Sequence, residues 1–340
     1  MHILEAESLA RHTTLRVGGL ANRFVIAESV PEIVATIREC DERGEQLLIL
    51  GAGSNVVISD SGFDGTVLHI ANKGVDYESH ACAGATVTVP AGEIFDDFIA
   101  HAVAKRWSGV EALSGIPGTV GATPIQNVGA YGQSVSDSIA RVRAYDRLKQ
   151  EMRTFHAADC GFGYRTSIFK RHAPRLIVVE VQFQLRLGEQ SMPITYPELA
   201  RELGIEVGQR SSAALVRETV LRLRTEKGMV LDPEDHDSWS VGSFFLNPIV
   251  EARMAPLDAP QWPQPDGTVK VSAAWLIEHA GIGKGFALGG AATSTRHALA
   301  ITNRGQATAA SVKELANLIR ARVRVAFGIN LEPEPTFVNR

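Results

Sequence analysis

Apolar residues recur every three to four positions in several stretches of the chain, and each stretch is bounded by residues that commonly cap a helix. Ser29 precedes the first stretch, in which Ile33, Val34 and Ile37 share one face, and Gly44 follows it. A serine start and a glycine end are typical of an amphipathic helix. The pattern therefore predicts a helix between Ser29 and Gly44.

The same spacing predicts further helices along the chain. One spans residues 93–106, and its apolar side comprises Ile94, Phe98, Ile99, Ala102 and Val103. Another follows a polar stretch at residues 204–212, and its apolar face comprises Leu215, Val216, Thr219, Val220 and Leu223. Ser272 caps a short helix that ends at Gly281. A last helix runs from about residue 311 to residue 327 and turns inward Val312, Leu315, Ile319 and Val323.

Short apolar runs between Gly, Asp and Asn turns indicate strands. They lie at residues 46–50, 56–59, 66–70, 86–89, 139–145 and 176–187. The proline-rich residues 256–267 predict a loop between elements. Strand runs and helical patterns that follow one another in this irregular order predict an α+β fold with mixed, mostly antiparallel sheets.

Composition limits the classes of function. With 340 residues the chain is long enough for two or three domains. A net charge of -4 gives no basic surface for nucleic acid, so no nucleic-acid partner is expected. Charged residues interrupt the N-terminal segment and no apolar run could span a membrane, so we expect a cytoplasmic protein without a membrane partner.

Cysteine and histidine positions give no metal-ligand spacing. The three cysteines, Cys40, Cys82 and Cys160, are scattered, and we interpret them as small buried or half-buried residues. No metal is expected.

The first glycine-rich loop, Leu-Gly-Ala-Gly-Ser-Asn at residues 50–55, follows a predicted strand. A Rossmann dinucleotide motif would need a third glycine and a following helix, but Val56 occupies that place and begins another strand-like run. The Rossmann interpretation therefore fails. The loop can still direct several backbone N–H groups at a phosphate, and a tight β-turn is the alternative.

The second glycine-rich segment is longer. Ser-Gly-Ile-Pro-Gly-Thr-Val-Gly at residues 114–121 precedes Ile-Gln-Asn-Val-Gly-Ala-Tyr-Gly at residues 125–132, with five glycines in nineteen residues. Such a sequence is poor material for a core or a regular element, but it suits close approach of the backbone to a large polar ligand. A structural turn is the alternative.

Three reactive or charged groups stand in unusual surroundings. Ser243 lies between a glycine and two phenylalanines, Arg165 follows Tyr164 in a Gly/aromatic stretch, and Glu334 stands between two prolines. A hydroxyl, a guanidinium and a carboxylate would suit a site for a carboxylated substrate. Taken singly, they are also explained as a turn hydroxyl, a surface ion pair and a solvated carboxylate.

Several segments, in order along nearly the whole chain, resemble the UDP-N-acetylenolpyruvoylglucosamine reductases, the MurB family of flavoenzymes. They are TTLRVGG (13–19), LGAGSNVV (50–57), SGIPGTVGATPIQNVGAYG (114–132), FGYRTSIFK (162–170), GSFFLNP (242–248) and LEPE (331–334). The segment ITYPEL (194–199) is similar to the longer subclass, in which a tyrosine loop closes over substrate. Leu246 departs from the family pattern, where many members carry lysine.

The resemblance implies a three-domain flavoprotein. Residues 1–70 and 71–212 would form two FAD-binding subdomains, and residues 213–340 a C-terminal substrate domain whose last residues return to the first. It implies noncovalent FAD, NADPH as reductant, and reduction of UDP-N-acetylglucosamine enolpyruvate to UDP-N-acetylmuramate in peptidoglycan precursor synthesis. A monomer is the expected state.

The resemblance also implies roles for individual residues. Ser243 would donate a proton, Arg165 would bind the substrate carboxylate, and Glu334 would share the proton or the charge; Glu332 fits that position less well. The FAD-binding residues would be Gly51, Gly53, Ser54, Asn55, Ser114, Gly115, Ile116, Pro117, Gly118, Thr119 and Gly121. Substrate would contact Tyr164, Tyr196, Lys227 and Asn247, although Tyr196 and Lys227 are also explained as a loop tyrosine and an exposed helix-end lysine.

Two other functions stay open at this point. A flavin oxidase of the same broad architecture is one, but many of these attach flavin through His or Cys in the glycine loops, and neither loop contains one. The other is a nucleotide-sugar binding protein without redox chemistry, which the joint presence of Arg165, Ser243 and Glu334 disfavours.

Overall fold

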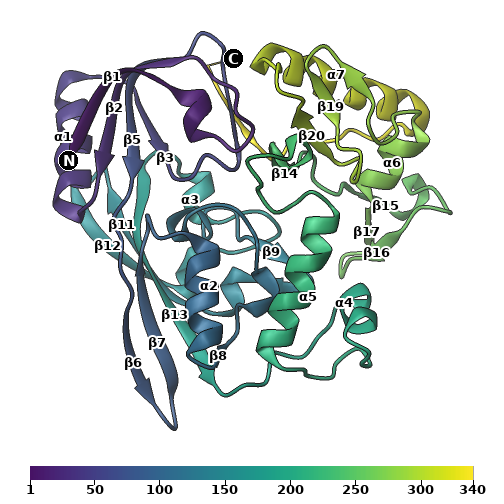
Figure 1. Ribbon diagram of the computed structural model, residues 1–340, viewed down its shortest axis with the longest axis horizontal. Helices are drawn as coiled ribbons and strands as arrows, with labels where there is room; N and C mark the ends of the chain where they lie inside the picture. The colour runs from purple at the N-terminus through teal and green to yellow at the C-terminus, as the bar shows by residue number, and fades with distance from the viewer. Residues whose placement is uncertain (340) are drawn as a thin grey trace. The chain divides into compact units, whose positions relative to one another are not determined.

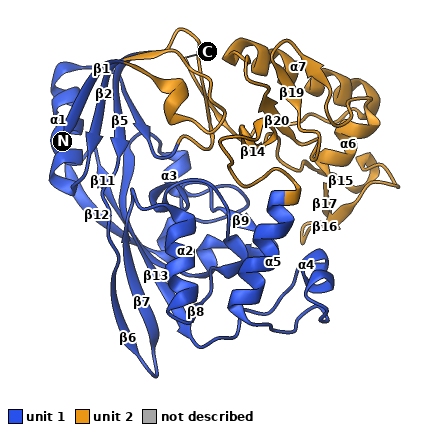
Figure 2. Cartoon of the chain, viewed as in Figure 1, with its two compact units in different colours: residues 1–6, 22–52, 64–225 blue, residues 7–21, 53–63, 226–340 orange. Residues whose placement is uncertain are grey.

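The computed structural model describes residues 1–339, and the chain divides into two compact units. Unit 1 comprises residues 1–6, 22–52 and 64–225, and unit 2 comprises residues 7–21, 53–63 and 226–340 (Figure 2). Each unit is thus assembled from segments that are distant in sequence. The three-domain division at residues 70 and 212 stays a prediction.

Unit 1 contains two sheets. The first has the order β1-β2-β5-β3, and β3 and β5 are parallel. The second has the order β12-β11-β13-β7-β6, with the short β8 also paired to β13, and its neighbouring strands run antiparallel (Figure 1). The strands are β1 (His2–Ser8), β2 (Leu20–Ala27), β3 (Leu47–Leu50), β5 (Phe63–Ile70), β6 (Asp76–His80), β7 (Gly84–Pro90), β8 (Trp107–Ser108), β11 (Ile139–Asp146), β12 (Glu151–His156) and β13 (Leu176–Leu187). A separate hairpin joins β9 (Gly129–Ala130) and β10 (Gln133–Ser134).

Two amphipathic helices cover these sheets. Helix α1 (Val30–Arg43) buries Ile33 and Ile37 in one core with Leu68 of β5 and Val179 of β13. Helix α2 (Phe95–Ala104) buries Phe98 against Phe183 of β13, with ring centroids 4.7 Å apart. The two helices confirm the faces that their spacing predicts, although Ile94 lies outside α2 as its exposed N-cap.

The remaining helices of unit 1 are α3 (Ile168–Arg171), α4 (Pro197–Glu202) and α5 (Ala213–Glu226). Helix α5 packs Val216, Val220 and Leu223 with Leu199 of α4. The prediction that Leu215 shares this face is wrong, because its side chain is exposed. Residues 216, 220 and 223 follow the helical repeat and share one face. Neighbouring residues of a helix lie about one hundred degrees apart around its axis, so Leu215 projects away from that face.

Unit 2 contains small sheets and two helices. One sheet has the order β14-β20-β19-β18, another the order β15-β17-β16, and β21 pairs in parallel with β4. The strands are β4 (Val56–Ile58), β14 (Ser240–Ser243), β15 (Ile249–Glu251), β16 (Gln261–Pro263), β17 (Thr268–Val271), β18 (Ala287–Leu288), β19 (Ala291–Thr293), β20 (Ala300–Asn303) and β21 (Thr336–Val338).

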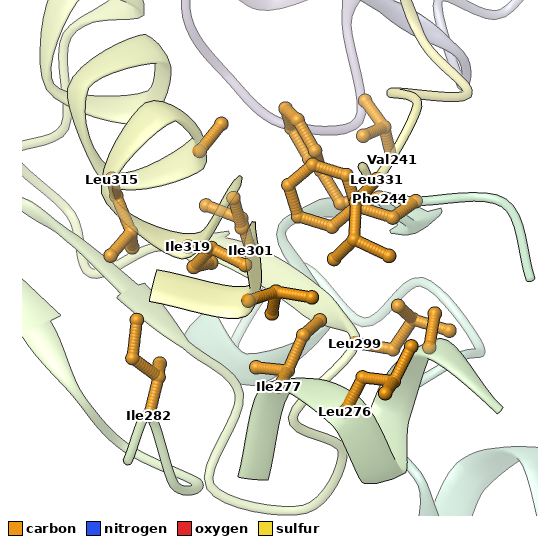
Figure 3. Packing of buried hydrophobic residues seen from close by; sticks show 14 of the residues in the cluster. Val241, Phe244, Leu276, Ile277, Ile282, Leu299, Ile301, Leu315, Ile319 and Leu331 are labelled. Atoms are coloured by element: carbon orange, nitrogen blue, oxygen red, sulfur yellow. The ribbon is translucent and has the colours of Figure 1, made fainter. Parts of the chain in front are cut away.

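Helices α6 (Ala273–His279) and α7 (Ala309–Phe327) close the core of unit 2. Figure 3 shows Leu276 and Ile277 of α6 near Ile301 of β20, with Leu315 and Ile319 of α7 in the same cluster. The cap of α7 is Thr308, whose hydroxyl accepts the N–H of Ser311. Helix α7 therefore starts at Ala309, two residues before the predicted start at Ser311. Ser311 is the third residue of the helix, and its side chain completes a capping box with Thr308.

Two other local predictions need correction. Residues 261–263 form β16 inside the predicted proline-rich loop; this is an edge strand, where a proline is tolerated. Cys82 is exposed, whereas Cys40 and Cys160 are buried as expected.

No helix among residues 1–339 is both long and apolar enough to cross a membrane. Within the same residues, no group of three or more His, Cys, Asp and Glu side chains has the arrangement to hold a metal ion.

Candidate active site

The glycine loop of unit 1, residues 114–121, is held by the segment that starts α2. The Phe95 N–H donates to the Gly118 carbonyl at 3.1 Å, and the Val120 N–H donates to the Glu93 carbonyl at 2.8 Å. Further along, the Gly121 N–H donates to the Ala91 carbonyl at 2.8 Å. A Cβ on Gly121 would lie 2.4 Å from Ala91 Cβ, so only glycine allows this close approach.

Two adjacent backbone N–H groups of this loop take no part in these hydrogen bonds. The N–H groups of Gly118 and Thr119 donate to no acceptor within residues 1–339, although Thr119 is buried. Buried backbone N–H groups nearly always have a partner, and successive N–H groups on a turn form an anion site. The turn at Gly118 and Thr119 therefore fits a phosphate group of a ligand.

The other predicted N–H donors of this loop are used inside the fold. The Ser114 and Ile116 N–H groups donate to the Glu111 and Leu113 carbonyls, each at 3.4 Å, and Pro117 has no N–H. The Gly115 N–H donates to Asp96 Oδ1 at 2.6 Å. The backbone N–H groups of this loop that can donate to a ligand are therefore those of Gly118 and Thr119.

The first glycine loop contributes to both units. Gly51, in unit 1, faces the same turn, because a Cβ there would lie 2.5 Å from Thr119 Oγ1. Gly53, in unit 2, has a φ of +60°, and a Cβ there would lie 2.1 Å from the His12 carbonyl oxygen. Both positions therefore require glycine, the first for space around Thr119 and the second for packing.

Asn55 connects the first loop to the C-terminal segment within unit 2. Its Nδ2 donates to the Glu334 carbonyl at 3.4 Å, and its own carbonyl accepts the Thr336 N–H at 3.0 Å. The neighbouring Ser54 belongs to the same turn of unit 2. Asn55 thus has a structural partner, and its predicted role toward a cofactor stays a prediction.

Arg165 occupies a strained turn of unit 1. It lies between Gly163 and Thr166, whose N–H groups donate to each other's carbonyls at 3.1 and 3.3 Å, and its φ is +53°. Its guanidinium donates to the Gly129 carbonyl at 3.0 Å. A non-glycine residue held with positive φ costs free energy, and such residues cluster at functional sites.

Ser243 owes its position to a bulge in β14. Ser240 pairs with Thr302 and Ser243 pairs with Ala300, so β14 has one residue more than its partner strand. Gly242 supplies the bulge with a φ of +75°. Bulges redirect side chains, and within residues 1–339 the half-buried Ser243 hydroxyl has no hydrogen bond.

Glu334 lies next to the same strand segment in unit 2. Its N–H donates to the Phe244 carbonyl at 2.9 Å, and the Leu246 N–H donates to the Glu332 carbonyl at 3.0 Å. The chain after Ser243 therefore pairs with residues 332–334. Glu332 is exposed and Glu334 is half-buried, which supports the choice of Glu334 as the candidate.

The segment that follows Ser243 and the segment that carries Glu334 are thus paired through their backbones in unit 2. Arg165 belongs to unit 1. The catalytic roles of these three residues stay predictions.

The predicted substrate residues have mixed surroundings. Tyr164 and Tyr196 are exposed, whereas Lys227 is half-buried. Tyr196 precedes α4 and meets Tyr131 edge to face at 5.4 Å. Although the residue as a whole is 37% exposed, desolvation of its phenol raises the pKa of Tyr196, and the charge of Glu198 raises it further, so this phenol is neutral at neutral pH.

Asn247 has a structural contact as well. Its side-chain Oδ1 accepts the N–H of Ala273, the first residue of α6, at 2.9 Å. Its predicted role toward the substrate stays a prediction.

Sequence reasoning missed two residues that act on the glycine loop. The Asp96 carboxylate accepts the Gly115 N–H, and it also accepts two N–H groups of Arg217 from α5 at 2.6 and 2.8 Å. An acidic residue in the first turn of a predicted helix was visible in the sequence. Nothing in the sequence links it to an arginine 121 positions later.

Comparison with known proteins supplies the family. The family described as UDP-N-acetylenolpyruvoylglucosamine reductase, C-terminal domain, matches residues 232–338, and that described as FAD binding domain matches residues 21–149. A UDP-N-acetylenolpyruvoylglucosamine reductase of Cutibacterium acnes is 53% identical over 97% of this chain and 89% of its own length. The chain belongs to the UDP-N-acetylenolpyruvoylglucosamine reductase family.

Other members of this reductase family agree. That of Mycobacterium tuberculosis is 47% identical over 99% of this chain and 95% of its own length. The crystal structure of the reductase from Thermus caldophilus covers 99% of this chain and 98% of its own, with a TM-score of 0.67 and 25% identity. The resemblance noted from the sequence motifs is therefore confirmed, and so are the α+β fold with an FAD-binding part and the FAD cofactor.

Proposed function

We propose that this chain reduces the enolpyruvyl group of UDP-N-acetylglucosamine enolpyruvate, using NADPH and bound FAD, to form UDP-N-acetylmuramate for peptidoglycan synthesis. The observation that carries this proposal is the match to named UDP-N-acetylenolpyruvoylglucosamine reductases over 97–99% of the chain. An FAD binding domain at residues 21–149 supports the cofactor.

The residues of the glycine loop fit that cofactor. The open N–H groups of Gly118 and Thr119 would hold its pyrophosphate, and Gly51 leaves space beside Thr119. Neither glycine loop contains a His or Cys for covalent attachment, so we propose noncovalent binding. FAD, when bound, would supply the hydride chemistry, and the protein would supply orientation and electrostatics.

Reduction of an enolpyruvyl double bond adds a hydride to one carbon and a proton to the other. Negative charge develops on the carbon next to the carboxylate before the proton arrives. A cation fixed at the carboxylate stabilises that charge more than it stabilises the ground state. We assign this task to Arg165, whose planar fork is oriented by the Gly129 carbonyl.

The proton needs a donor, and we assign this role to Ser243. The bulge at Gly242 directs its hydroxyl, which has no acceptor or donor within the described residues. A serine hydroxyl is a poor acid, so it needs help from its surroundings. Glu334, whose N–H donates to the carbonyl of Phe244, the residue after β14, is the candidate for sharing the proton or the charge.

We further propose that the protein is a cytoplasmic monomer. Its three cysteines are free, including the buried Cys40 and Cys160, which suits a reducing compartment. Sedimentation of the purified protein measures the mass directly, and a dimer would contradict the monomer.

The visible spectrum of the purified protein tests the proposed function. The protein should be yellow, should lose its absorbance with NADPH under anaerobic conditions, and should regain it when the enolpyruvyl substrate is added. Denaturation should release intact FAD into the supernatant. A colourless protein that takes up no FAD would contradict the proposal. A flavoprotein that NADPH reduces but the substrate does not reoxidise would be another kind of flavin enzyme.

A further inference from the structure

Asp96 contacts the glycine loop, residues 114–121, whose Gly118 and Thr119 N–H groups have no acceptor among residues 1–339. It is the second residue of α2, and its Oδ1 accepts the Gly115 N–H at 2.6 Å. Gly115 has a φ of +72°, a conformation that the loop needs in order to turn. The carboxylate thus holds the loop at the residue where it bends.

Arg217 holds Asp96 in turn. Its two terminal nitrogens donate to the two carboxylate oxygens at 2.6 and 2.8 Å, a bidentate pair in which the arginine side chain is 17% exposed and the aspartate side chain 30%. Burial by itself raises the pKa of Asp96, but the Arg217 fork and the Gly115 N–H outweigh it, and the pKa lies below its ordinary value. Asp96 is therefore ionised and fixed in orientation at neutral pH.

Residues 93–96 therefore hydrogen-bond to the glycine loop at three points. Two are backbone hydrogen bonds, from Phe95 N–H to Gly118 and from Val120 N–H to Glu93, and the third is the Asp96 side chain on Gly115. Two of these points lie on the turn that carries the two open N–H groups, because the Gly118 carbonyl shares a peptide group with the Thr119 N–H and Val120 follows Thr119. The third point, at Gly115, lies three residues before Gly118 and fixes the chain that enters the turn.

We propose that Asp96 and Arg217 are positioning residues that set the affinity for FAD, by orienting the Gly118 and Thr119 N–H groups toward its pyrophosphate. This inference rests on the proposed function, because the ligand of the loop is taken as FAD. Neither residue touches the reacting atoms. Their effect is to pre-organise the loop, so that FAD does not have to order it on binding.

The test compares variants of the purified holoenzyme. In D96A the Gly115 N–H loses its acceptor and Arg217 loses its partner. In D96N the amide oxygen can still accept the Gly115 N–H, but the charge is lost. In R217A the Asp96–Gly115 contact stays, without the fork that orients it.

A matched control removes a similar ion pair elsewhere in unit 1. Arg147 donates to both oxygens of Asp41, with side chains that are 18% and 25% exposed, and neither residue belongs to the glycine loop. The D41A variant thus loses a comparable arginine–aspartate pair at a site unrelated to the loop.

Two quantities are measured for each variant: the dissociation constant of FAD, from the fluorescence of flavin released on dilution, and the melting temperature of the flavin-free protein. Loss of a charge-assisted hydrogen bond should raise the FAD dissociation constant of D96A about 10- to 100-fold. D96N and R217A should raise it less, and excess FAD should restore the turnover number of all three. D41A should lower the melting temperature without changing FAD affinity.

An FAD dissociation constant in D96A within twofold of the unaltered protein would overturn the inference. The inference also fails if D41A, at a comparable loss of melting temperature, weakens FAD binding as much as D96A does. If D96A does not fold, D96N and R217A give the same comparison. If the unaltered protein itself binds no FAD, the proposed function fails first, and the two failures are distinguishable.

Discussion

At the scale of single residues, Ser243, which we propose as the proton donor, owes its position to features that its own side chain does not provide. The bulge at Gly242 turns the hydroxyl, and the residues that follow Ser243 pair through their backbone with residues 332–334, the segment that carries Glu334. The buried rings of Phe244 and Phe245, which follow Ser243, fix the backbone on that side. Proton donation by such a fixed hydroxyl can be separated from binding by experiment.

We expect Ser243→Ala to leave FAD binding and flavin reduction by NADPH nearly unchanged, because neither step needs the hydroxyl proton. Reoxidation of the flavin by the enolpyruvyl substrate should slow by about 10²–10⁴-fold or more, the range for loss of a general acid. Anaerobic stopped-flow of the two half-reactions measures both effects. Ser243→Cys should recover part of the rate, because a thiol is the stronger acid. Rapid reoxidation in the alanine variant would remove Ser243 from the mechanism.

Arg165 should respond even to a conservative change. Lysine keeps the charge but loses the bidentate fork, so Arg165→Lys should slow substrate-dependent reoxidation by about 2–4 kcal/mol of activation free energy. Reduction by NADPH should change much less. The control is Arg171→Lys, since Arg171 is an exposed residue that contacts the Gly161 carbonyl in the same region. Equal slowing of both half-reactions would contradict a role at the substrate carboxylate.

At the scale of elements, the bulge of β14 and the glycine loop at residues 114–121 perform comparable tasks. Each is a short irregular piece that a regular element holds in place: β20 holds the bulge, and the first turn of α2 holds the glycine loop. Irregular backbone can be aimed at a ligand because its groups are not used by a ladder or a helix. The cost is a conformation that only glycine adopts easily.

This cost gives a prediction for Gly242→Ala. A Cβ at this position meets no atom within 4 Å, so the penalty comes from the φ of +75° alone. The free energy of unfolding should fall by about 1–2 kcal/mol, the usual penalty for an L-residue in the left-handed region. Substrate-dependent reoxidation should also slow, since relaxation of the bulge would redirect Ser243.

Gly283→Ala is the matched control, because Gly283 also has open space around its Cα but no positive φ. Denaturant unfolding should find it neutral or slightly more stable. If both variants behave alike, the bulge is not under the conformational constraint described for Gly242.

At the scale of the whole molecule, resistance to acid depends on a buried carboxylate. Asp146, fully buried at the end of β11, accepts the Arg175 fork at 2.8 Å and an N–H of Arg153 at 3.1 Å. The Arg175 hydrogen bond, supported by Arg153 and by backbone N–H groups, holds the pKa of Asp146 far below its ordinary value despite burial. The folded state therefore favours the ionised form.

A depressed pKa contributes stability above the pKa of the unfolded chain, about 4 for an aspartate, and this stability is lost as the pH falls below it. We expect Asp146→Asn to lower the melting temperature at pH 7. The difference from the unaltered protein should narrow steadily between about pH 5 and pH 3. Thermal unfolding across this range measures it, with Glu251→Gln, which removes an exposed pair with Arg253, as a control that shifts little. A difference that is constant with pH would contradict the assignment.

Much of the fold followed from the sequence because local patterns carried it. The faces of α1 and α2 follow the helical repeat of their apolar residues, and the glycine end of α1 is a local conformational requirement. The errors arose where a residue's environment is set by packing or pairing with another element and not by its own local pattern. Residues 261–263 became a strand because β17 pairs with them, and Leu215 is exposed because α4 packs on another face of α5.

The sequence by itself determined the family, through ordered motifs whose glycines, arginine and serine are chemically demanding. It also identified Ser243, Arg165 and Glu334 as candidates, because each stands where packing alone does not explain it. Only the tertiary structure decided which N–H groups of the glycine loop are open and which are used. It also showed that Asp96 and Arg217, 121 residues apart, support that loop. Hydrogen bonds between distant segments depend on how the chain folds back, and no local pattern records them.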